Sequence, residues 1–479
     1  MKVLPLPAFK YLFYLALFCM PLALHAGALP AAVEQALAAA EIPHSAVAIQ
    51  IEPLQGGRAV LSFNAKQLMN PASVMKLVTT YAALQRLGPT YTWNTSAYVD
   101  ALPLDGVLDG NVYLSGGGDP KLTLEAFWLL LRQLRLHGVR EIRGDLVLDR
   151  SRYALPTHDP AAFDGAPQRP YNVAPDPLLL SYQALRLQFM PQADGKPLVV
   201  ADPQFPALEL VNLLEPNAAS HAACGDWKDT VRVDFGGAPP NLTVMLTGRY
   251  PAACGEQSWL FGLPAGVDYV GGVFRQYWTE MGGTLAGSTR SGVLPPTARL
   301  LARQESPPLA EVVRDVNKFS NNVMARMVYL SLGAEAGARP VRLANAEAAV
   351  RQFWGGLSLP AADLVLENGS GLSRRERLTA ASLSRLLQHA WASPLMPEFI
   401  ASLPIAGLDG TLKKRMNAPP IQGQAHLKSG SLDGVRALAG YVQDARGTRY
   451  ALVMFVNHAH AERSGPAQEA LLRWLIERD

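Results

Sequence analysis

The amino-acid sequence predicts an α/β (α+β) fold in which helices cover an antiparallel sheet and a large, mostly β region interrupts the domain. Three observations support this prediction. Strand-like segments followed by a helix stand near the start of the chain, and strand-like segments followed by a helix return at its end. The middle is instead rich in Gly, Pro and short β-like runs. Sheet segments at both ends predict one domain that the middle of the chain interrupts.

Length and composition limit the classes of protein to which this chain can belong. Its 479 residues exceed one ordinary hydrophobic core. Hydrophobic residues make up 49% of the chain and charged residues 17%, which is typical of globular proteins rather than disordered ones. The net charge of +3, without any Lys/Arg block, argues against binding to nucleic acid.

Residues 1–28 have the pattern of a secretory signal peptide. Lys2 and Lys10 carry positive charge, and the run Tyr11–Leu24 is apolar and uncharged. This run is short for a membrane span, which takes about 20 residues, and Ala26-Gly27-Ala28 offers small residues for cleavage. We therefore expect an exported, periplasmic protein with no stable transmembrane anchor in the mature chain. An uncleaved anchor is the alternative.

Two stretches, 29–87 and 297–479, are expected to form the discontinuous domain. The first stretch begins with a helix, continues with two strands joined by a Gly-rich turn, and ends with a second helix. In that second helix Asn70 can be the N-cap and Pro71 the first residue. The last stretch ends in three strands and an amphipathic helix. The expected ranges are 29–40 (helix), 46–51 and 59–64 (strands), 70–87 (helix), 424–428, 435–443 and 450–457 (strands), and 466–478 (helix).

The inserted region is expected to cover residues 88–296, as one or two mostly β subdomains. Of the three cysteines, Cys19 lies in the signal segment, which leaves Cys224 and Cys254 as an even pair in an exported chain. Such a pair favours a disulfide, and two buried thiols are the alternative.

Three short motifs stand in order along the chain. Ser73-Val74-Met75-Lys76 is the only S-x-x-K in the sequence, Ser320-Asn321-Asn322 is S-x-N, and Lys428-Ser429-Gly430 is K-[S/T]-G. Each motif alone is weak, but this order is typical of penicillin-binding proteins and class A β-lactamases. The trio therefore predicts nucleophilic catalysis by a serine.

The first motif supplies a nucleophile and its base. Ser73 and Lys76 are three residues apart and so share one face of a helix. A serine hydroxyl needs a base within hydrogen-bond reach, and a lysine amine can serve only when it is neutral. Burial, the helix N-terminus and a second cation such as Lys428 would each lower the pKa of Lys76. An ordinary capped helix with a surface lysine is the alternative.

The other two motifs supply the walls of the site. The strand edge at Lys428 can pair with an extended peptide, and Gly430 lacks a Cβ where a substrate backbone approaches. Lys428 and Ser429 can hold a carboxylate, while the N–H of Ser431 is the expected second oxyanion donor. Ser320 is placed to pass a proton to the leaving amine, and Asn322 to orient Lys76. A solvated strand end and a polar helix cap are the corresponding alternatives.

The sequence resembles the low-molecular-mass class C penicillin-binding proteins, which are D-alanyl-D-alanine carboxypeptidases/endopeptidases. Beyond the trio, six blocks spread over the mature chain are similar to blocks of that family. Departures are mild: Asn368 and Asn321 stand where aspartate is usual or common, and Ser429 replaces a threonine but keeps the hydroxyl. The six blocks are Gly110–Pro120, Arg143–Asp149, Cys224–Trp227 with Cys254–Glu256, Glu367–Arg374, Leu403–Leu412 and Leu427–Leu432.

The resemblance implies a penicillin-binding, transpeptidase-like domain with an insertion after the first motif. It implies a serine DD-peptidase that acts on peptidoglycan stem peptides through an acyl-enzyme on Ser73 and is inhibited by β-lactams. It also implies that an acid near Asp164 meets the free amino group of the stem peptide's diamino acid, although a plain turn residue is an equal interpretation of Asp164.

Other functions fit the sequence less well. A β-lactamase-like hydrolase would need a dedicated deacylation base, and no E-x-x-x-N stands between the second and third motifs in the usual way. A non-catalytic peptidoglycan-binding protein would not need all the motif residues intact. A metallopeptidase is disfavoured because H-E-x-x-H does not occur, and His458 and His460 lack a third ligand. We expect no metal and no cofactor.

Overall fold

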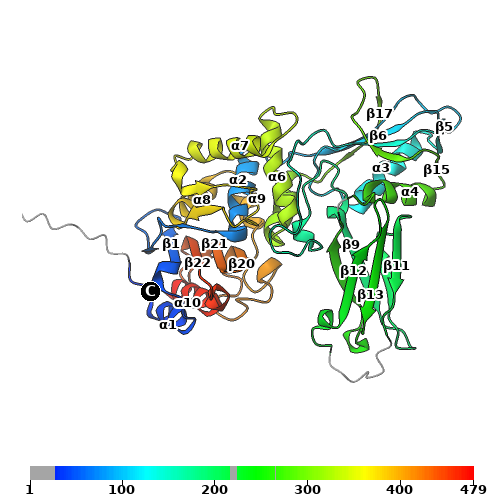
Figure 1. The fold of residues 1–479 in the computed structure, drawn as a ribbon. Helices are drawn as coiled ribbons and strands as arrows, with labels where there is room; N and C mark the ends of the chain where they lie inside the picture. Colours follow the sequence, from blue (N-terminus) through cyan, green and yellow to red (C-terminus); the bar gives the residue numbers. More distant parts are fainter. Residues whose placement is uncertain (1–26, 216–223, 265, 479) are drawn as a thin grey trace, which may run out of the picture.

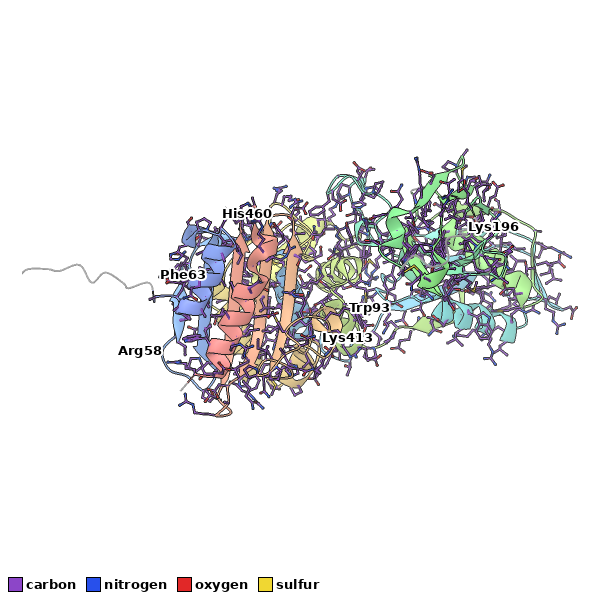
Figure 2. The ribbon with its side chains drawn as sticks, turned by 90° about the horizontal axis from the view of Figure 1, so that it is seen from below. Arg58, Phe63, Trp93, Lys196, Lys413 and His460 are labelled. Carbon is purple, nitrogen blue, oxygen red and sulfur yellow. A yellow bond between two sulfur atoms is a disulfide. The ribbon has the colours of Figure 1, made fainter. Side chains whose placement is uncertain are left out.

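The computed structural model describes residues 27–215, 224–264 and 266–478. The predicted signal segment therefore lies almost wholly outside the described residues. The described chain forms a helix-covered sheet on one side and a strand-rich inserted region on the other (Figure 1). Seen from below, Phe63 of the sheet and Lys196 of the inserted region lie toward opposite ends of the molecule, with Trp93 between them (Figure 2).

The discontinuous domain is built on a five-stranded antiparallel sheet with the order β2-β1-β22-β21-β20. Strands from both ends of the chain thus pair directly, which confirms the predicted fold class. β20 runs through the third motif rather than ending at it, so the strand is longer than the sequence pattern indicated. The strands are β1 Val47–Pro53, β2 Leu61–Phe63, β20 Ala425–Leu432, β21 Val435–Gln443 and β22 Arg449–Asn457.

The two faces of this sheet are buried against different helices. In β22 the even-numbered residues 452–456 pack on the side of α1 and α10, and the odd-numbered residues 451–455 pack on the opposite side, as the period of a strand requires. Figure 1 shows α1 and α10 below the sheet and the other labelled helices of this domain above it. The helices below are α1 Ala31–Ala39 and α10 Gly465–Ile476.

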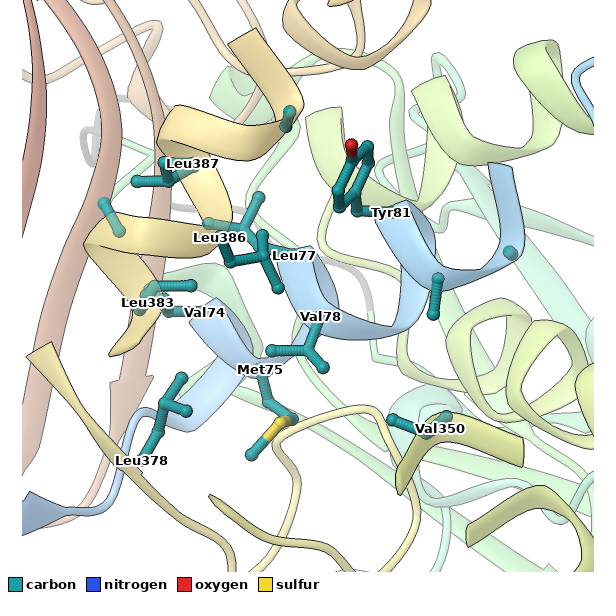
Figure 3. Close-up of a cluster of buried hydrophobic side chains, with 14 of the residues drawn as sticks. Val74, Met75, Leu77, Val78, Tyr81, Val350, Leu378, Leu383, Leu386 and Leu387 are labelled. Atoms are coloured by element: carbon teal, nitrogen blue, oxygen red, sulfur yellow. The ribbon is translucent and has the colours of Figure 1, made fainter. Parts of the chain in front are cut away.

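Helix α2 (Lys76–Leu87) is the central element above the sheet, and Lys76 to Leu84 are all buried. Figure 3 shows Val74 and Leu77 beside the leucines of α8, such as Leu386, inside one apolar cluster. Truncating a fully buried leucine such as Leu77 to alanine typically costs about 2–5 kcal/mol, so this packing holds the start of α2 firmly. The helices around α2 are α5 Leu309–Lys318, α6 Asn322–Glu335, α7 Leu343–Gly356, α8 Ala380–Ala392 and α9 Met396–Ala401.

Short strands complete the discontinuous domain. They form a three-stranded sheet with the order β18-β19-β3, in which β3 immediately precedes the first motif. The strands are β3 Leu68–Met69, β18 Leu364–Val365 and β19 Arg377–Thr379.

The largest sheet of the inserted region is a mixed sheet with the order β16-β8-β6-β4-β17. Helix α3 packs against it and α4 packs against α3, and the expectation of a mostly β region did not include these two helices. Its edge strand β17 lies beyond residue 296, and the predicted domain limits stay predictions. The elements are β4 Asn94–Val99, β6 Val112–Ser115, β8 Leu146–Asp149, β16 Thr289–Ser291 and β17 Arg299–Glu305, with α3 Leu124–Leu136 and α4 Tyr269–Glu280.

The remaining strands of the inserted region form three small sheets. Two of them, β10-β9-β14 and β11-β13-β12, hang below the mixed sheet in Figure 1, and β15-β7-β5 lies beside it. The strands are β5 Val107–Leu108, β7 Glu141–Ile142, β9 Ala184–Met190, β10 Leu198–Asp202, β11 Leu208–Asn212, β12 Val231–Gly236, β13 Leu242–Gly248, β14 Gln257–Gly262 and β15 Thr284–Leu285.

Cys224 and Cys254 form a disulfide in this lower part, with 4.6 Å between their Cα atoms. The predicted pairing is confirmed. In the chain-entropy treatment, closing a loop of this size contributes roughly 3–4 kcal/mol to stability, which suits a small lobe built from two three-stranded sheets.

The inserted region contacts the discontinuous domain through α6. Val173 and Leu179 of the inserted region pack with Val323 and Met327 of α6 in a separate small core. Because α6 begins within the second motif, the inserted region is attached beside the residues that the sequence singled out.

Across residues 27–215, 224–264 and 266–478, we find neither a helix that is long and apolar enough to cross a membrane nor a metal-binding group of His, Cys, Asp or Glu.

Candidate active site

The first motif lies on a tight turn that leads into α2. The Asn70 side chain accepts a hydrogen bond from the Ala72 N–H at 2.8 Å, but Pro71, not Asn70, holds the N-cap position of the turn. The helix proper starts later than predicted: a 3-10 turn covers Ala72–Met75, and α2 begins at Lys76. Ala72 has φ of +45°, a left-handed conformation that is rare for a residue with a side chain. The residue before Ser73 is therefore held in a strained conformation.

A glycine from a distant loop supports this turn. A Cβ placed on Gly371 would lie 1.9 Å from the Ala72 carbonyl oxygen and 2.7 Å from the Ser73 nitrogen. Gly371 also has φ of +80°, a region that side chains disfavour. The loop therefore approaches the turn more closely than any other residue type would allow.

Lys76 is wholly buried and makes three contacts that define its environment. Its Nζ lies 2.9 Å from the Ser73 Oγ and 2.5 Å from the Asn322 Oδ1, and it also contacts the Ser370 carbonyl oxygen. A neutral amine has two N–H donors and one lone pair. Asn322 and Ser370 can accept the two N–H groups, which leaves the lone pair directed at the Ser73 hydroxyl.

The environment of Lys76 favours its neutral form. Burial is the largest cause that lowers the pKa of Lys76, and the positive charge of Lys428 lowers it further. The carboxylate of Glu376 acts in the opposite direction, and Arg326 again lowers the pKa. The net direction is well below the ordinary lysine value, as a base for Ser73 requires.

The second motif lies between α5 and α6. Asn321 caps α6 by accepting the Met324 N–H at 3.0 Å, and Ser320 adopts a left-handed φ of +57° just before it. This turn directs the Ser320 hydroxyl to Lys428 and places Asn322 against Lys76. The cap expected as an alternative is thus present, and it coexists with the contacts to both lysines.

Lys428 extends from the middle of β20 and is also wholly buried. Its Nζ donates to the Ser320 Oγ at 2.8 Å and to the Ser429 carbonyl at 2.7 Å. Burial lowers the pKa of Lys428 to about 7. The two lysines thus belong to one cluster with Ser73 and Ser320. The positive charge of Lys428 disfavours the protonated form of Lys76.

Gly430 lies on the same face of β20 as Lys428, and the structure gives its missing side chain a second consequence. A Cβ there would lie 2.7 Å from the Pro71 carbonyl oxygen and 3.1 Å from the Ala72 Cβ. The missing side chain therefore lets the strand approach the turn that carries Ser73, and the expected room for a substrate backbone stays a prediction. On the other face, the hydroxyl groups of Ser429 and Thr411 are 2.8 Å apart.

β20 is an edge strand, and part of its outer edge is already paired. The Leu427 N–H donates outward to the Pro404 carbonyl at 2.8 Å. Ser429 and Ser431, two and four residues further on, direct their N–H groups to the same side because a strand alternates with a period of two. This orients the Ser431 N–H toward the open edge, where an oxyanion donor is needed.

Sequence reasoning did not single out Glu376, which organises the loop that reaches Lys76. Glu376 is fully buried, and its carboxylate accepts the backbone N–H groups of Glu367, Asn368, Gly369 and Gly371 at 2.9–3.1 Å. Burial raises its pKa, and the hydrogen bonds oppose that rise. The block Glu367–Arg374 marked the loop, but the carboxylate that shapes it lies just outside the block.

Asp164 belongs to a loop of the inserted region and contacts none of the three motifs. It accepts hydrogen bonds from the Tyr171 hydroxyl at 2.7 Å and from Asn172 at 2.8 Å. The loop is anchored by Phe163, whose ring lies 4.7 Å from the guanidinium of Arg374. Burial acts to raise the pKa of Asp164, but its hydrogen bonds outweigh this and hold the pKa below the ordinary value.

The structure therefore brings the three motifs together, because Lys76 of the first contacts Asn322 of the second and Lys428 of the third contacts Ser320 of the second. Ser73, Lys76 and Asn322 form one chain of contacts, Ser320 and Lys428 form a second, and the charge of Lys428 affects Lys76. Such an arrangement can activate a hydroxyl, hold a negative charge and return a proton to a leaving group.

Known proteins resemble the chain along most of its length. Residues 29–477 match the family described as the D-Ala-D-Ala carboxypeptidase 3 (S13) family. The D-alanyl-D-alanine carboxypeptidase of Actinomadura sp. (strain R39) is 31% identical over 436 residues, which cover 87% of this chain and 77% of the relative. The D-alanyl-D-alanine carboxypeptidase DacB of Haemophilus influenzae is 25% identical over 413 residues, which cover 83% of this chain and 82% of the relative.

A solved structure shows the same fold. The crystal structure of penicillin binding protein 4 (dacB) from Haemophilus influenzae matches with a TM-score of 0.74 and 23% identity, covering 92% of this chain and 98% of that one. A second structure of that protein, in complex with a β-lactam, matches with a TM-score of 0.71.

Proposed function

The chain belongs to the D-Ala-D-Ala carboxypeptidase 3 (S13) family, and we propose that Ser73 is its nucleophile and forms an acyl-enzyme. The protein is a serine-type D-Ala-D-Ala peptidase. The observation that carries the assignment of Ser73 is the 2.9 Å contact between its Oγ and the Nζ of the wholly buried Lys76. A neutral lysine at this distance is the base that a serine hydroxyl needs.

Acylation begins when the Ser73 Oγ attacks the carbonyl carbon of the scissile D-Ala–D-Ala bond. Lys76 takes the hydroxyl proton because its pKa is lowered and its N–H groups are committed to Asn322 and Ser370. The N–H groups of Ser73 and Ser431 stabilise the oxyanion. The strained Ala72 turn and the close contact with Gly371 support this proposal because they fix the orientation of the Ser73 N–H.

The second lysine serves the departing end of the substrate. Lys428 and Ser429 hold the terminal carboxylate, and Ser320, 2.8 Å from the Lys428 Nζ, passes a proton to the leaving amine. Water then hydrolyses the ester on Ser73. We propose peptidoglycan stem peptides as the substrates.

β-Lactams should act as inhibitors because their opened ring stays attached to the acyl-enzyme and blocks the approach of water. The complex of a β-lactam with the structurally similar penicillin binding protein 4 supports this proposal. The direct test is mass spectrometry of the intact protein after exposure to benzylpenicillin, followed by peptide mapping. A stoichiometric adduct on the peptide that carries Ser73 is expected, and an adduct on another peptide would refute the assignment.

We also propose that the protein is exported and works in the periplasm. The disulfide between Cys224 and Cys254 is consistent with an oxidising compartment, and the signal-like pattern of residues 1–28 agrees with it.

We further propose that Asp164 binds the free amino group of the stem peptide's diamino acid. Its carboxylate is exposed and ionised, and the Oδ2 accepts a hydrogen bond from Tyr171. Arg374 connects its loop to the end of β20, since it stacks on Phe163 and pairs with Asp433 at 3.3 Å. A substrate paired with β20 would then extend toward this carboxylate.

Asp164→Ala should lower kcat/KM for a D-Ala-D-Ala peptide with a free diamino-acid side chain. The corresponding activation free energy should rise by roughly 1–3 kcal/mol, the usual contribution of a charge-assisted hydrogen bond. The same peptide acetylated on that amine should be cleaved almost as well as by the wild-type enzyme. Steady-state kinetics with the peptide pair give both numbers.

Two further variants sharpen this comparison. Asp164→Asn keeps one oxygen for the turn but removes the charge and the oxygen that accepts the Tyr171 hydroxyl, so it should behave like Asp164→Ala on the free amine. Asp194→Ala alters a similar turn in the distant β9–β10 hairpin, where Asp194 accepts the Lys196 N–H at 3.0 Å, and should change neither peptide. Equal losses on both peptides would leave Asp164 a plain turn residue.

Gly371→Ala should slow acylation by benzylpenicillin by on the order of 10²-fold, because the new Cβ would displace the turn that carries Ser73, and small misplacements of reacting groups are that costly. The rate of acylation can be followed with a labelled penicillin. Gly337→Ala is the matched control, since Gly337 also has a positive φ but nothing lies within 4 Å of its Cβ position. Equal rates for the two variants would show that backbone strain, not the contact with Ser73, decides the effect.

A further inference from the structure

The block Leu403–Leu412 forms a loop that covers part of the outer edge of β20. The Leu427 N–H donates to the Pro404 carbonyl at 2.8 Å, and within the described residues the backbone contacts between the loop and the strand end there. The loop then turns through a short 3-10 helix, Gly410–Leu412. Thr411 lies on this turn, beside the part of β20 that the loop leaves uncovered.

The turn that carries Thr411 is fixed on both sides. Before Thr411, the carboxylate of Asp409 contacts the Nζ of the buried Lys318, which lies two residues before Ser320. A Cβ on Gly410 would lie only 2.5 Å from the Lys318 carbonyl oxygen. After Thr411, the wholly buried Leu412 belongs to the apolar core below the sheet. The Thr411 side chain is therefore held in one place relative to the second and third motifs.

The hydroxyl groups of Thr411 and Ser429 form a pair. Their oxygen atoms are 2.8 Å apart, and in the described part of the chain neither hydroxyl has another hydrogen-bond partner. Ser429 is only 7% exposed, whereas Thr411 is partly exposed. Two hydroxyl groups have two protons, and a single contact between them uses one. One proton of the pair thus remains for a ligand.

A carboxylate at Ser429 decides which hydroxyl donates to which. An ionised carboxylate only accepts hydrogen bonds, so the single proton of Ser429 must point to it. The Ser429 oxygen is then an acceptor toward Thr411, and the Thr411 hydroxyl must be the donor. Two hydrogen bonds that run in the same direction polarise and strengthen each other.

We propose that Thr411 is a positioning residue for the terminal carboxylate of the substrate. Its hydroxyl donates to the Ser429 Oγ and so directs the proton of Ser429 to the carboxylate. This role rests on the proposed function, in which Ser429 binds that carboxylate. The loop that carries Thr411 is thus part of the recognition of the departing residue, although Thr411 itself acts only through Ser429.

Thr411→Val removes the hydroxyl and keeps the shape of the side chain. It should lower kcat/KM for a D-Ala-D-Ala peptide by about tenfold, which corresponds to one hydrogen bond. Thr411→Ser retains the donor and should stay within about twofold of the wild-type enzyme. For the same peptide with a C-terminal carboxamide, which carries no charge at this position, Thr411→Val should change the rate by less than about twofold. A merely structural role would affect both peptides equally.

A double-mutant cycle with Ser429→Ala tests whether Thr411 acts through Ser429. Ser429→Ala should itself slow cleavage of the carboxylate peptide, and adding Thr411→Val should then cost nothing further, because the hydroxyl that it positions is absent. Thr247→Val makes the same chemical change on the distant β13, at another partly exposed threonine, and should leave both peptides unaffected.

The outcomes separate this role from the proposed function. A wild-type protein without a benzylpenicillin adduct on Ser73, or a Ser429→Ala variant with full activity on the carboxylate peptide, would overturn the proposed function and the role of Thr411 together. With the adduct present and Ser429→Ala impaired, three results would overturn the role of Thr411 alone. They are wild-type rates in Thr411→Val, equal losses on the two peptides, and additive losses in the double variant.

Discussion

Ser73→Ala should abolish the covalent adduct with benzylpenicillin and reduce peptide cleavage by at least on the order of 10⁴-fold, as removal of a serine nucleophile does. The thermal melt should barely change. Ser73 is only partly buried, and Lys76 retains its contacts with Asn322 and Ser370 when the hydroxyl is absent. Intact-protein mass spectrometry and a melting curve measure the two effects on one sample.

Ser62→Ala is the matched control for this variant. Ser62 begins a second S-x-N tripeptide, Ser62-Phe63-Asn64, but it lies exposed on β2. Its loss should leave the adduct at full strength. A full-strength adduct in Ser73→Ala would mean that another residue is acylated, and the roles given to Lys76 and Asn322 would then have to be abandoned.

Lys428→Ala should slow acylation by roughly 10²-fold or more, because the carboxylate of the ligand loses a charged partner. It should also move the rising limb of the pH profile to higher pH. The rate rises as Lys76 loses its proton, and the charge of Lys428 helps to lower the pKa of Lys76. Removing that charge favours protonated Lys76, so a higher pH is needed to produce the neutral base.

The falling limb gives a second signature of the same residue. Burial lowers the pKa of Lys428 to about 7, so the wild-type enzyme should lose its grip on the carboxylate as pH rises past this value. That limb should vanish in Lys428→Ala and in Lys428→Met, which keeps more of the buried stem. Lys413→Ala removes an exposed lysine of the same domain and should preserve both limbs. An unchanged profile in the Lys428 variants would leave Lys428 with a structural role in β20 only.

The motifs and the sheet could be predicted because each depends on short-range patterns. A separation of three positions on one helical turn brings Ser73 and Lys76 into contact. Alternation of buried and exposed side chains marks the strands at both ends of the chain. Hydrophobic strands at the two ends must pair to bury their faces, and so β1 and β22 could be placed in one sheet.

Other features could not be predicted because they depend on contacts between distant segments. The carbonyl of Ser370 reaches Lys76, and Gly371 contacts Ala72, only because Glu376 folds the intervening loop around its carboxylate. The close contact of Gly430 could not be predicted for the same reason: the neighbour of its missing Cβ is Pro71, from the other end of the chain. The sequence analysis did not predict the helices α3 and α4, because the surrounding sequence is rich in Gly and Pro.

The pairing of β1 with β22 has a consequence for when the enzyme becomes active. A chain is synthesised from its N-terminus, and its parts fold as they emerge. Among the strands that the structure describes, β4 to β17 pair only with one another, so the inserted region can fold while the C-terminal part is still being made. Lys428 is synthesised with β20, which is among the last strands. Lys76 can contact Asn322 only after the 246 residues that separate them in sequence have been synthesised. Peptidase activity is thus the last property that the nascent chain acquires, and a chain truncated before β20 would lack it.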